Sequence, residues 1–343
     1  LRKYGVSRDA WMSTAPMIAG LAHSLDDYEI HTGVEWNGRI TAFVKDDTLI
    51  PETLLVRHQP PRVGEKYYID LIGKYGYSNK RYRVKKQAQW IPGLTLHITQ
   101  TGHFGHFLLE GLARLWPILL AEGLPIANIF FDKPVLPVTA DLLRHAIPAS
   151  IKQVHATPKT SLRFEQLIVP LPSYRDRCDI SPFHPRVCIK IAQAMLKPMP
   201  WEQLPDLGFI LSRRRAFDKG KEFAHSRPSD DPRHYDDLLQ QGYIEVYPEL
   251  LTFEQQLVIA NTASHLVGPI GSAFHLILFR ENPRRLRTTY IHHNKLITHS
   301  YRMIDTLLDI DAEYRLVAPP LPSKSKKDSV QTRLGRLLPF RKG

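Results

Sequence analysis

The stretch GYIEVYPELLTFEQQLVIANTASHLVGPIGSAFHLILF, residues 242–279, decides the fold class. Apolar runs of strand length alternate in it with runs at helical spacing. The expected elements are strand Ile244–Tyr247, helix Phe253–Thr262, strand His265–Val267 and helix Ser272–Phe279. Strands that alternate with helices indicate a parallel sheet covered on both faces. The sequence therefore predicts an α/β fold, whose ligands bind beyond the carboxyl ends of the strands.

The same alternation continues on both sides of this stretch. Strand Leu207–Leu211 and helix Tyr235–Gln241 precede it, and strand Thr288–Ile291 follows it. Further upstream, apolar residues at helical spacing from Gly105 to Leu120 predict a long helix. Proline inside a helix removes a hydrogen bond, so Pro117 should kink this helix near its end.

The length of the chain predicts two domains. A chain of 343 residues exceeds one ordinary core and fits two α/β domains of about 150 residues each. Prolines flank the helical segment Val187–Leu196, which we expect to connect them. The expected boundaries are an N-terminal domain over 1–195, a C-terminal α/β domain over 196–318 and a basic tail over 319–343. The N-terminal domain should begin with an irregular layer of short strands, at Ile40–Val44, Leu54–Val56 and Tyr67–Ile72.

Composition narrows the class of protein. The net charge is +12, and residues 321–343 supply half of it with seven Lys or Arg and one Asp. Such charge suits anionic partners, but no nucleic-acid-binding motif accompanies it, so we expect no nucleic-acid partner. Two cysteines, Cys178 and Cys188, form no CxxC pair, which indicates neither a disulfide scaffold nor a structural zinc site and favours a reducing cytoplasm. The chain begins with Leu, which indicates a piece of a longer polypeptide.

The basic tail leaves two interpretations open. Its apolar residues can share one helical face with two arginines near the edge: Val330, Leu334, Leu337 and Leu338, beside Arg333 and Arg336. Such a face would lie on an anionic membrane. The alternative is a disordered connector to another domain.

The first candidate for chemistry is the pair His106 and Glu110. A spacing of four puts imidazole and carboxylate on one helical face, with Arg114 one turn further. The carboxylate can orient the ring, or either group can serve as a base. The alternative is an ordinary polar pair at a helix surface.

The second and third candidates would bind a diphosphate. Arg213 and Arg215 follow strand Leu207–Leu211 directly, where guanidinium groups can hold a diphosphate bidentately. The turn Gly271-Ser272-Ala273 opens the next expected helix, so its amides can bind phosphate oxygens. The alternative readings are a solvated basic loop and an ordinary turn.

The segment Thr252-Phe-Glu-Gln255 also has two readings. Thr followed three residues later by Gln is typical of a capping box, which explains both residues by structure alone. Glu254 and Gln255 could instead bind a ribose or a base. A metal site is not expected, because the one Asp-x-Asp, Asp309-Ile-Asp311, does not follow a buried strand and no HExxH exists.

Taken in order, these motifs resemble glycosyltransferase family 61, including its bacterial members for capsular polysaccharide synthesis. The matching residues are His106 and Glu110, then Ser212-Arg213, then the block from Gly242 to Gln255, then Gly268-Pro-Ile-Gly271-Ser272. The resemblance extends over about 100–120 and 207–280, and the Pro248-Glu to Glu-Gln255 block is its most specific part. His103 stands where the family usually has Asn, and His275-Leu276 stands where bacterial relatives often have His-Asn.

The resemblance implies a GT-B fold, in which two Rossmann-like domains face a central cleft. It implies an inverting transferase that moves a sugar from a nucleotide-sugar to a glycan of a capsule or other surface polysaccharide, without metal or other cofactor. His106 or Glu110 would be the base, with His103 and Arg114 on the acceptor side. The donor would contact the second domain, through Arg213, Arg215, Glu254, Gln255, Gly271, Ser272, Ala273 and His275.

The expected location is the cytoplasm, at the inner face of the membrane if the basic tail associates with it. The alternative function is a non-catalytic sugar-binding or scaffold domain of a polysaccharide assembly protein.

Overall fold

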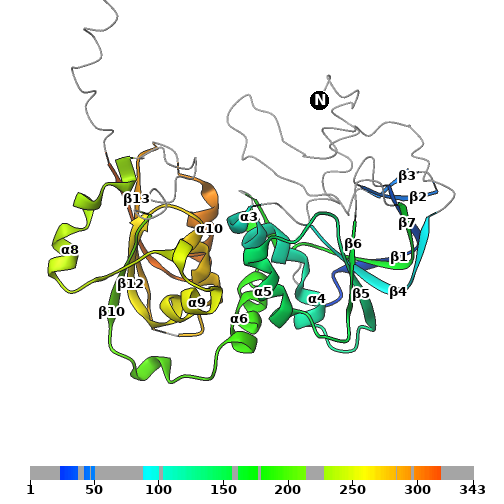
Figure 1. Cartoon of the computed structure of the whole chain (residues 1–343), viewed down its shortest axis with the longest axis horizontal. Coiled ribbons are helices and arrows are strands. Elements are labelled where there is room, and N and C mark those ends of the chain that lie inside the picture. The colour runs from blue at the N-terminus through cyan, green and yellow to red at the C-terminus, as the bar shows by residue number, and fades with distance from the viewer. Residues whose placement is uncertain are drawn as a thin grey trace, which may run out of the picture.

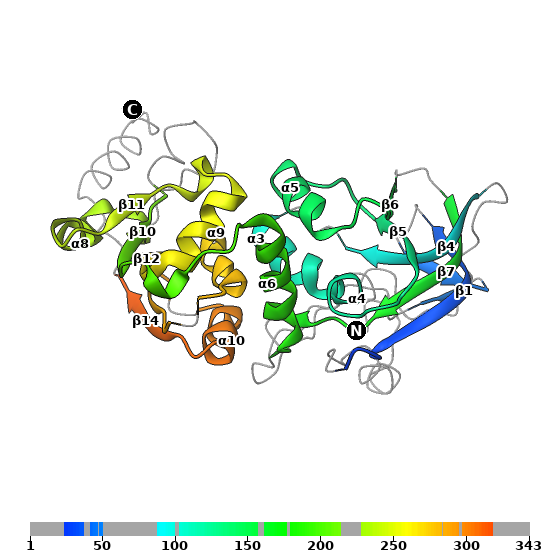
Figure 2. The same cartoon turned by 90° about the horizontal axis from the view of Figure 1, so that it is seen from below.

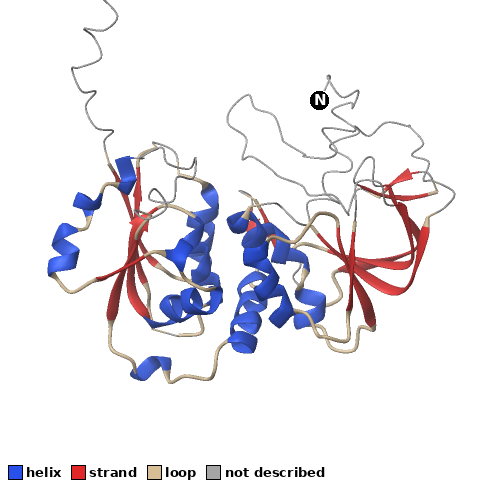
Figure 3. Ribbon diagram, in the orientation of Figure 1, coloured by secondary structure: helices blue, strands red, loops and turns tan. Residues whose placement is uncertain are grey.

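Two β-sheets organise the chain, and helices fill the space between them (Figures 1 and 3). The computed structural model describes residues 24–37, 42–46, 48–50, 88–99, 103–156, 161–176, 179–213, 228–282, 284–294 and 297–317. We call the part from β1 to α6 the first lobe and the part from β10 to β14 the second lobe. The expected strands at 54–56 and 67–72, Arg215, Cys178 and the basic tail lie outside the described residues.

The first sheet is mixed. Its strands follow the order β3-β2-β1-β7-β4-β5-β6. Strands β4, β5, β6 and β7 are parallel, whereas β1 pairs antiparallel with β7 and begins the antiparallel ribbon β1-β2-β3. The strands are β1 Tyr28–Asn37, β2 Ala42–Lys45, β3 Thr48–Leu49, β4 Gln89–Ile98, β5 Ile126–Phe131, β6 Lys152–His155 and β7 Ser161–Pro170. A small ribbon of β8 Tyr174–Arg175 and β9 Asp179–Ile180 follows.

The second sheet is parallel throughout. Its order β11-β10-β12-β13-β14 reverses direction between β10 and β12, which makes that pair the topological switch point of the sheet. The strands are β10 Leu207–Leu211, β11 Ile244–Val246, β12 Ala263–Pro269, β13 Arg287–His292 and β14 Asp311–Leu316. The predicted α/β class with a parallel sheet is therefore confirmed, and the finer GT-B arrangement stays a prediction.

Helices of both lobes pack against one another between the two sheets (Figure 2). The first lobe contributes α3 Phe104–His106, α4 Trp116–Leu119, α5 Pro137–Ala146 and α6 Phe183–Met195. The second contributes α9 Phe253–Thr262, the 3₁₀ helix η9 Ser272–Phe279 and α10 His299–Leu307, while α8 Asp236–Gln240 lies on its far side. Short 3₁₀ turns are η5 Trp201–Gln203, η6 Pro228–Asp230, η7 Pro232–His234 and η8 Pro248–Leu250.

The two lobes share one hydrophobic core. A single cluster of buried side chains contains Leu108 and Ile191 of the first lobe together with Leu257 and Phe279 of the second. This cluster crosses the expected boundary at residue 195, and the division into 1–195 and 196–318 remains a prediction. Within the described ranges, no helix has the length and apolar character needed to cross a bilayer.

The expected helix from Gly105 to Leu120 was wrong. Helix α3 passes into a π-helix, η3 Phe107–Gly111, then a 3₁₀ turn, η4 Leu112–Arg114, and finally α4. The π turn is recorded by the Leu112 amide, which donates to the Phe107 carbonyl five residues back. The Phe107 ring packs over Gly111, four residues later in the same π turn, where a Cβ would meet its Cδ2 at 2.4 Å, so glycine at 111 leaves room for the ring.

The second expected helix that differs is Ser272–Phe279, which is a 3₁₀ helix over the same residues. Helix α10 and strand β14 were not anticipated. Helix α9, by contrast, begins and ends where the sequence predicts, and strand β10 does too.

Gly268 is required by the close approach of β12 to β10. A Cβ on Gly268 would lie 2.7 Å from the Leu211 carbonyl oxygen, which is backbone and cannot move aside cheaply. We predict that Gly268→Ala lowers the free energy of unfolding by about 1–3 kcal/mol, because the added methyl overpacks the sheet. Gly271→Ala is the matched control, since its Cβ would meet nothing closer than 3.6 Å. Denaturant unfolding of both variants checks this, and equal stabilities would contradict it.

Candidate active site at the contact between the lobes

The pair His106 and Glu110 lies where the helical segment of the first lobe meets the second lobe. His106 ends α3 and Glu110 belongs to the π-helix, so the two residues come from different helical types. His106 Nδ1 lies 2.9 Å from Glu110 Oε2. The His106 side chain is 36% exposed and that of Glu110 only 2%. The predicted contact is therefore confirmed, and the imidazole is the member of the pair that solvent reaches.

The buried carboxylate has a stabilising neighbour in this imidazole. An ionised carboxylate is costly to bury unless a charge or hydrogen-bond donor faces it. Protonation of His106 supplies a charge next to Glu110, so the pair can accept one proton without leaving an isolated buried anion. A carboxylate placed in this way can orient an imidazole, and the role of His106 as a base stays a prediction.

Gly105 brings this pair against the second lobe. A Cβ on Gly105 would lie 2.7 Å from Ser272 Cβ and 3.3 Å from His275 Nδ1. No other residue could occupy position 105 without moving the first turn of η9. Since Gly105 immediately precedes His106, the contact sets the candidate base beside the turn that should bind phosphate.

His275 lies inside this contact. Its side chain is buried, and its ring packs on Tyr301 of α10 with centroids 5.1 Å apart. Burial, followed by the nearby His106, lowers the pKa of His275 to about 3, so the ring is neutral at physiological pH. The structure places this residue next to Gly105, and its predicted role in donor binding stays a prediction.

The donor-side candidates follow the two strands of the switch point. Ser212 is buried directly after β10, its amide bonded to the Val246 carbonyl at 2.8 Å, and the half-buried Arg213 comes next. On the neighbouring strand, β12 ends at Pro269 and leads into the Gly271 turn. The carboxyl ends of β10 and β12 therefore bring Arg213 and this turn to the same edge of the sheet.

The Gly271 turn leaves amides available at the start of η9. The Phe274 amide donates to the Gly271 carbonyl at 3.1 Å, which is the first bond of the 3₁₀ helix. The amides of Ser272 and Ala273 precede that bond and have no acceptor within the helix. Gly271 itself has an extended backbone, and a Cβ there would meet the Pro269 carbonyl oxygen at 3.6 Å, an ordinary contact. Ser272 and Ala273 are half-buried, and the amides of a first helical turn can bind an anionic oxygen.

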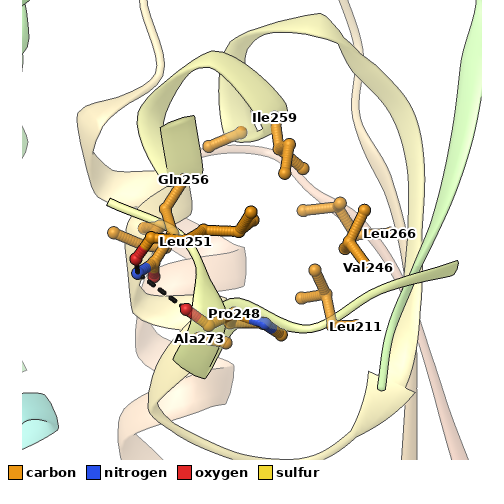
Figure 4. A pocket seen from close by; sticks show the side chains of 10 residues that line it. Leu211, Val246, Pro248, Leu251, Gln256, Ile259, Leu266 and Ala273 are labelled. Atoms are coloured by element: carbon orange, nitrogen blue, oxygen red, sulfur yellow. Dashed lines mark hydrogen bonds between the residues drawn. The ribbon is translucent and has the colours of Figure 1, made fainter. Parts of the chain in front are cut away.

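An apolar hollow lies beside this edge, between α9, η9 and the ends of β10 and β11 (Figure 4). Nine of its ten lining residues are apolar, among them Leu211 and Ala273. Gln256 is the polar exception, and its amide donates to the Pro248 carbonyl at 3.0 Å. The hollow thus adjoins both the end of β10 and the start of η9.

The capping box at the start of α9 is confirmed. The Thr252 amide donates to Gln255 Oε1 at 2.9 Å, and the Gln255 amide donates to Thr252 Oγ1 at 3.2 Å. The Gln255 carbonyl oxygen therefore has a structural partner, while Glu254 projects from an exposed position. A role for either residue in donor binding stays a prediction.

The two acceptor-side candidates are His103 and Arg114, and their roles stay predictions. The His103 ring lies 5.4 Å from that of His106 in an edge-to-face arrangement, and burial lowers its pKa, with His106 as the second cause. Arg114 was expected one α-helical turn beyond Glu110, and it lies in the 3₁₀ turn η4. Burial, followed by the nearby Arg114, lowers the pKa of His97 on β4 to about 3, so Arg114 lies near that ring.

Carboxylates do not gather at this site in the manner of metal ligands. Across the ranges that the structure describes, no three His, Cys, Asp or Glu side chains lie together as a metal would need. Asp309 has a φ of 50° in the turn after α10, and Asp311 begins β14. Metal independence remains a prediction for experiment.

Sequence reasoning missed three residues around Glu110: Ser173, Tyr174 and His184. His184 Nε2 lies 3.2 Å from the Leu108 carbonyl oxygen, and Ser173 Oγ lies 2.9 Å from His184 Nδ1. Tyr174 is buried and interacts electrostatically with Glu110. The sequence contained one indication of these partners. Pro117 has no N–H, so the carbonyl of residue 113 lacks its helical donor and needs a partner from elsewhere in the chain.

The sequence of this chain matches one known protein family. The model of the family described as Glycosyltransferase 61 matches residues 104–287, which include every described candidate residue except His103. Among curated proteins, none matches this chain at a significant level. The family match covers more than half of the chain and includes the His106–Glu110 pair, the end of β10, the capping box and the Gly271 turn. This chain belongs to the glycosyltransferase 61 family.

Proposed function

We propose that this chain is an inverting, metal-independent glycosyltransferase that moves a hexosyl or pentosyl group from a nucleotide-sugar to a glycan acceptor. The contact of Gly105 with Ser272 and His275 carries the proposal, because it sets the His106–Glu110 pair beside the Gly271 turn. Transfer of a sugar to a hydroxyl group requires two parts: a base for the hydroxyl and a turn that binds the anionic leaving group. Family membership supports the reaction class.

In the proposed reaction His106 is the base and Glu110 holds it. Nδ1 of His106 faces Glu110, so Nε2 is the nitrogen left to receive a proton from the acceptor hydroxyl. The hydroxyl oxygen forms a bond to the anomeric carbon as the bond to the diphosphate oxygen breaks, which inverts that carbon. The proton ends on His106, and Glu110 stabilises the imidazolium. The difference in exposure favours His106 over Glu110 as the group that meets the acceptor.

The second lobe would stabilise the departing diphosphate. The transition state for glycosyl transfer resembles an oxocarbenium ion, and negative charge develops on the leaving phosphate. Arg213 at the end of β10 and the amides of Ser272 and Ala273 can offset that charge without a metal ion. A capsular or other bacterial surface polysaccharide as acceptor, and a cytoplasmic site of action at the inner membrane face through the basic tail, belong to the same proposal.

The first test is binding and turnover in the presence of EDTA. We expect one class among UDP-, GDP- and dTDP-sugars to raise the thermal unfolding midpoint, because a hundredfold excess over Kd stabilises the folded state by about 2.7 kcal/mol. With a glycan acceptor the same donor should release nucleoside diphosphate. Turnover that EDTA abolishes and Mn²⁺ or Mg²⁺ restores would refute the metal-free mechanism. Binding without turnover would instead indicate the non-catalytic sugar-binding domain.

The second test concerns Arg213. Arg213→Lys keeps the charge but loses the planar pair of donors, so the affinity for the nucleotide-sugar should fall by about 1–3 kcal/mol. Isothermal titration against the stabilising donor measures this. Arg144→Lys on α5 is the control, because Arg144 is exposed and forms an ion pair with Asp141 of the same helix. An unchanged Kd in Arg213→Ala would remove Arg213 from the site.

The third test concerns the base unit. His106→Ala and Glu110→Ala should each lower turnover by about 10²–10⁴ and leave donor binding nearly unchanged. The double variant should be little worse than the more severe single variant, because the two residues act as one unit. His145→Ala, an exposed histidine on α5, is the control that should retain full activity. Folded single variants with near-normal turnover would reduce the pair to a structural contact.

A further inference from the structure

Two backbone carbonyls on either side of Glu110 lack the donors that an α-helix would give them. The α-helical donor for the Leu108 carbonyl is the Leu112 amide, and that amide donates to Phe107 instead. The α-helical donor for the Ala113 carbonyl would be residue 117, which is proline and has no N–H. Buried carbonyls need partners, so both must be satisfied from outside the segment.

Ser173 satisfies the Ala113 carbonyl. Its amide donates to this oxygen at 2.7 Å, and its hydroxyl lies 3.0 Å from the same atom. Trp116 adds a second hydrogen bond to the same segment, residues 171–176, which we call the strap: Trp116 Nε1 donates to the Leu171 carbonyl at 2.8 Å. The segment after β7 is therefore bonded to the helical segment just beyond Glu110.

His184 satisfies the Leu108 carbonyl. Its Nε2 lies 3.2 Å from that oxygen, which can only accept, so Nε2 carries the proton. Burial lowers the pKa of His184 to about 4, so the ring is neutral and Nδ1 is an acceptor at physiological pH. The Ser173 hydroxyl, 2.9 Å away, then donates to Nδ1. The proton positions in the pair are thus determined by its neighbours.

We propose that Ser173 and His184 form a clamp that positions Glu110 for catalysis. The His184 ring holds the carbonyl of Leu108 and the Ser173 amide holds that of Ala113, while the Ser173 hydroxyl holds the ring; Glu110 lies on the π turn between the two carbonyls. It acts through Glu110 and touches no substrate, so both members are positioning residues. The inference rests on the proposed function and extends it to residues on a different helix and strap.

The clamp is also tied to the second lobe. Tyr174 follows Ser173, and its hydroxyl donates to Ser300 of α10 at 2.8 Å. Ser300 in turn donates to Asp176 at 3.1 Å, so the strap and α10 share a buried network. Since Tyr301, next in α10, packs on His275, the strap connects the support of Glu110 with the residue that faces Gly105. One chain of contacts therefore holds both sides of the candidate site.

Two variants separate the clamp from general packing. His184→Leu removes both polar contacts, whereas His184→Gln keeps a side-chain amide that can donate to the Leu108 carbonyl. Ser173→Ala removes the hydroxyl but leaves the amide bond to Ala113, and serves where His184→Leu fails to fold. Thr139→Val is the matched control, because it removes another buried hydroxyl of the first lobe, which donates to the Leu136 carbonyl at 2.9 Å.

Hydrogen exchange followed by mass spectrometry measures how firmly the clamp holds the segment that contains Glu110. In His184→Leu and Ser173→Ala, amides of residues 103–119 should exchange about tenfold faster or more, because a lost buried hydrogen bond weakens local stability by that order. Turnover with the donor identified by thermal shift should fall about tenfold or more while KM for that donor stays within about threefold. His184→Gln should restore both, and Thr139→Val should change neither.

Two results would overturn the clamp. Unchanged exchange in both clamp variants would show that the segment is held by packing alone. Faster exchange with unchanged turnover would show that the clamp does not position a catalytic group. If the unsubstituted chain is itself inactive, the proposed function is refuted, and the catalytic role of the clamp with it. This result is distinguishable from the other two, which are measured on the variants.

Discussion

The close approach of Gly105 to Ser272 is the constraint on which the candidate site depends. A side chain at position 105 would collide with Ser272, so the two backbones meet only because glycine is there. On one side of this contact the next residue is His106, and on the other the chain opens η9 with two amides. The shared hydrophobic core, which includes Leu108 and Phe279, holds the contact in place. A single glycine thus sets the proposed base of one lobe beside the proposed anion-binding turn of the other.

The broken helix around Glu110 is the second feature that function would use. A π turn is an irregularity that is frequent at functional sites. Here the buried carboxylate of Glu110 lies on the π turn and contacts the half-exposed imidazole of His106. The irregularity needs support, because it leaves the carbonyls of Leu108 and Ala113 without helical donors. His184 and the Ser173 strap supply that support from outside the segment. The same strap reaches α10, so the irregular segment is held by both lobes.

The sequence predicted what depends on neighbours along the chain. The capping box of Thr252 and Gln255 and the bounds of α9 and β10 follow from local signals, and the structure confirms them. The broken helix was missed because its carbonyls depend on partners far along the chain: Ser173, 60 residues away, bonds the Ala113 carbonyl, and His184 bonds that of Leu108. Spacing correctly brought His106 to Glu110, whereas the acceptor-side role of Arg114 stays a prediction. The order of the sheets, and hence the switch point at β10 and β12, required long-range pairing that no local pattern encodes.

A crystal structure of the chain with the nucleoside diphosphate product of its donor would test the central claim most directly. The distances to measure run from the terminal phosphate oxygens to the amides of Ser272 and Ala273, and from the terminal phosphorus to the His106 ring. Our account predicts phosphate oxygens at about 3 Å from at least one of these amides, with Arg213 beside the diphosphate and His106 facing it across the Gly105 contact. A diphosphate bound away from the Gly271 turn, or on the side of the second sheet that faces away from His106, would contradict it.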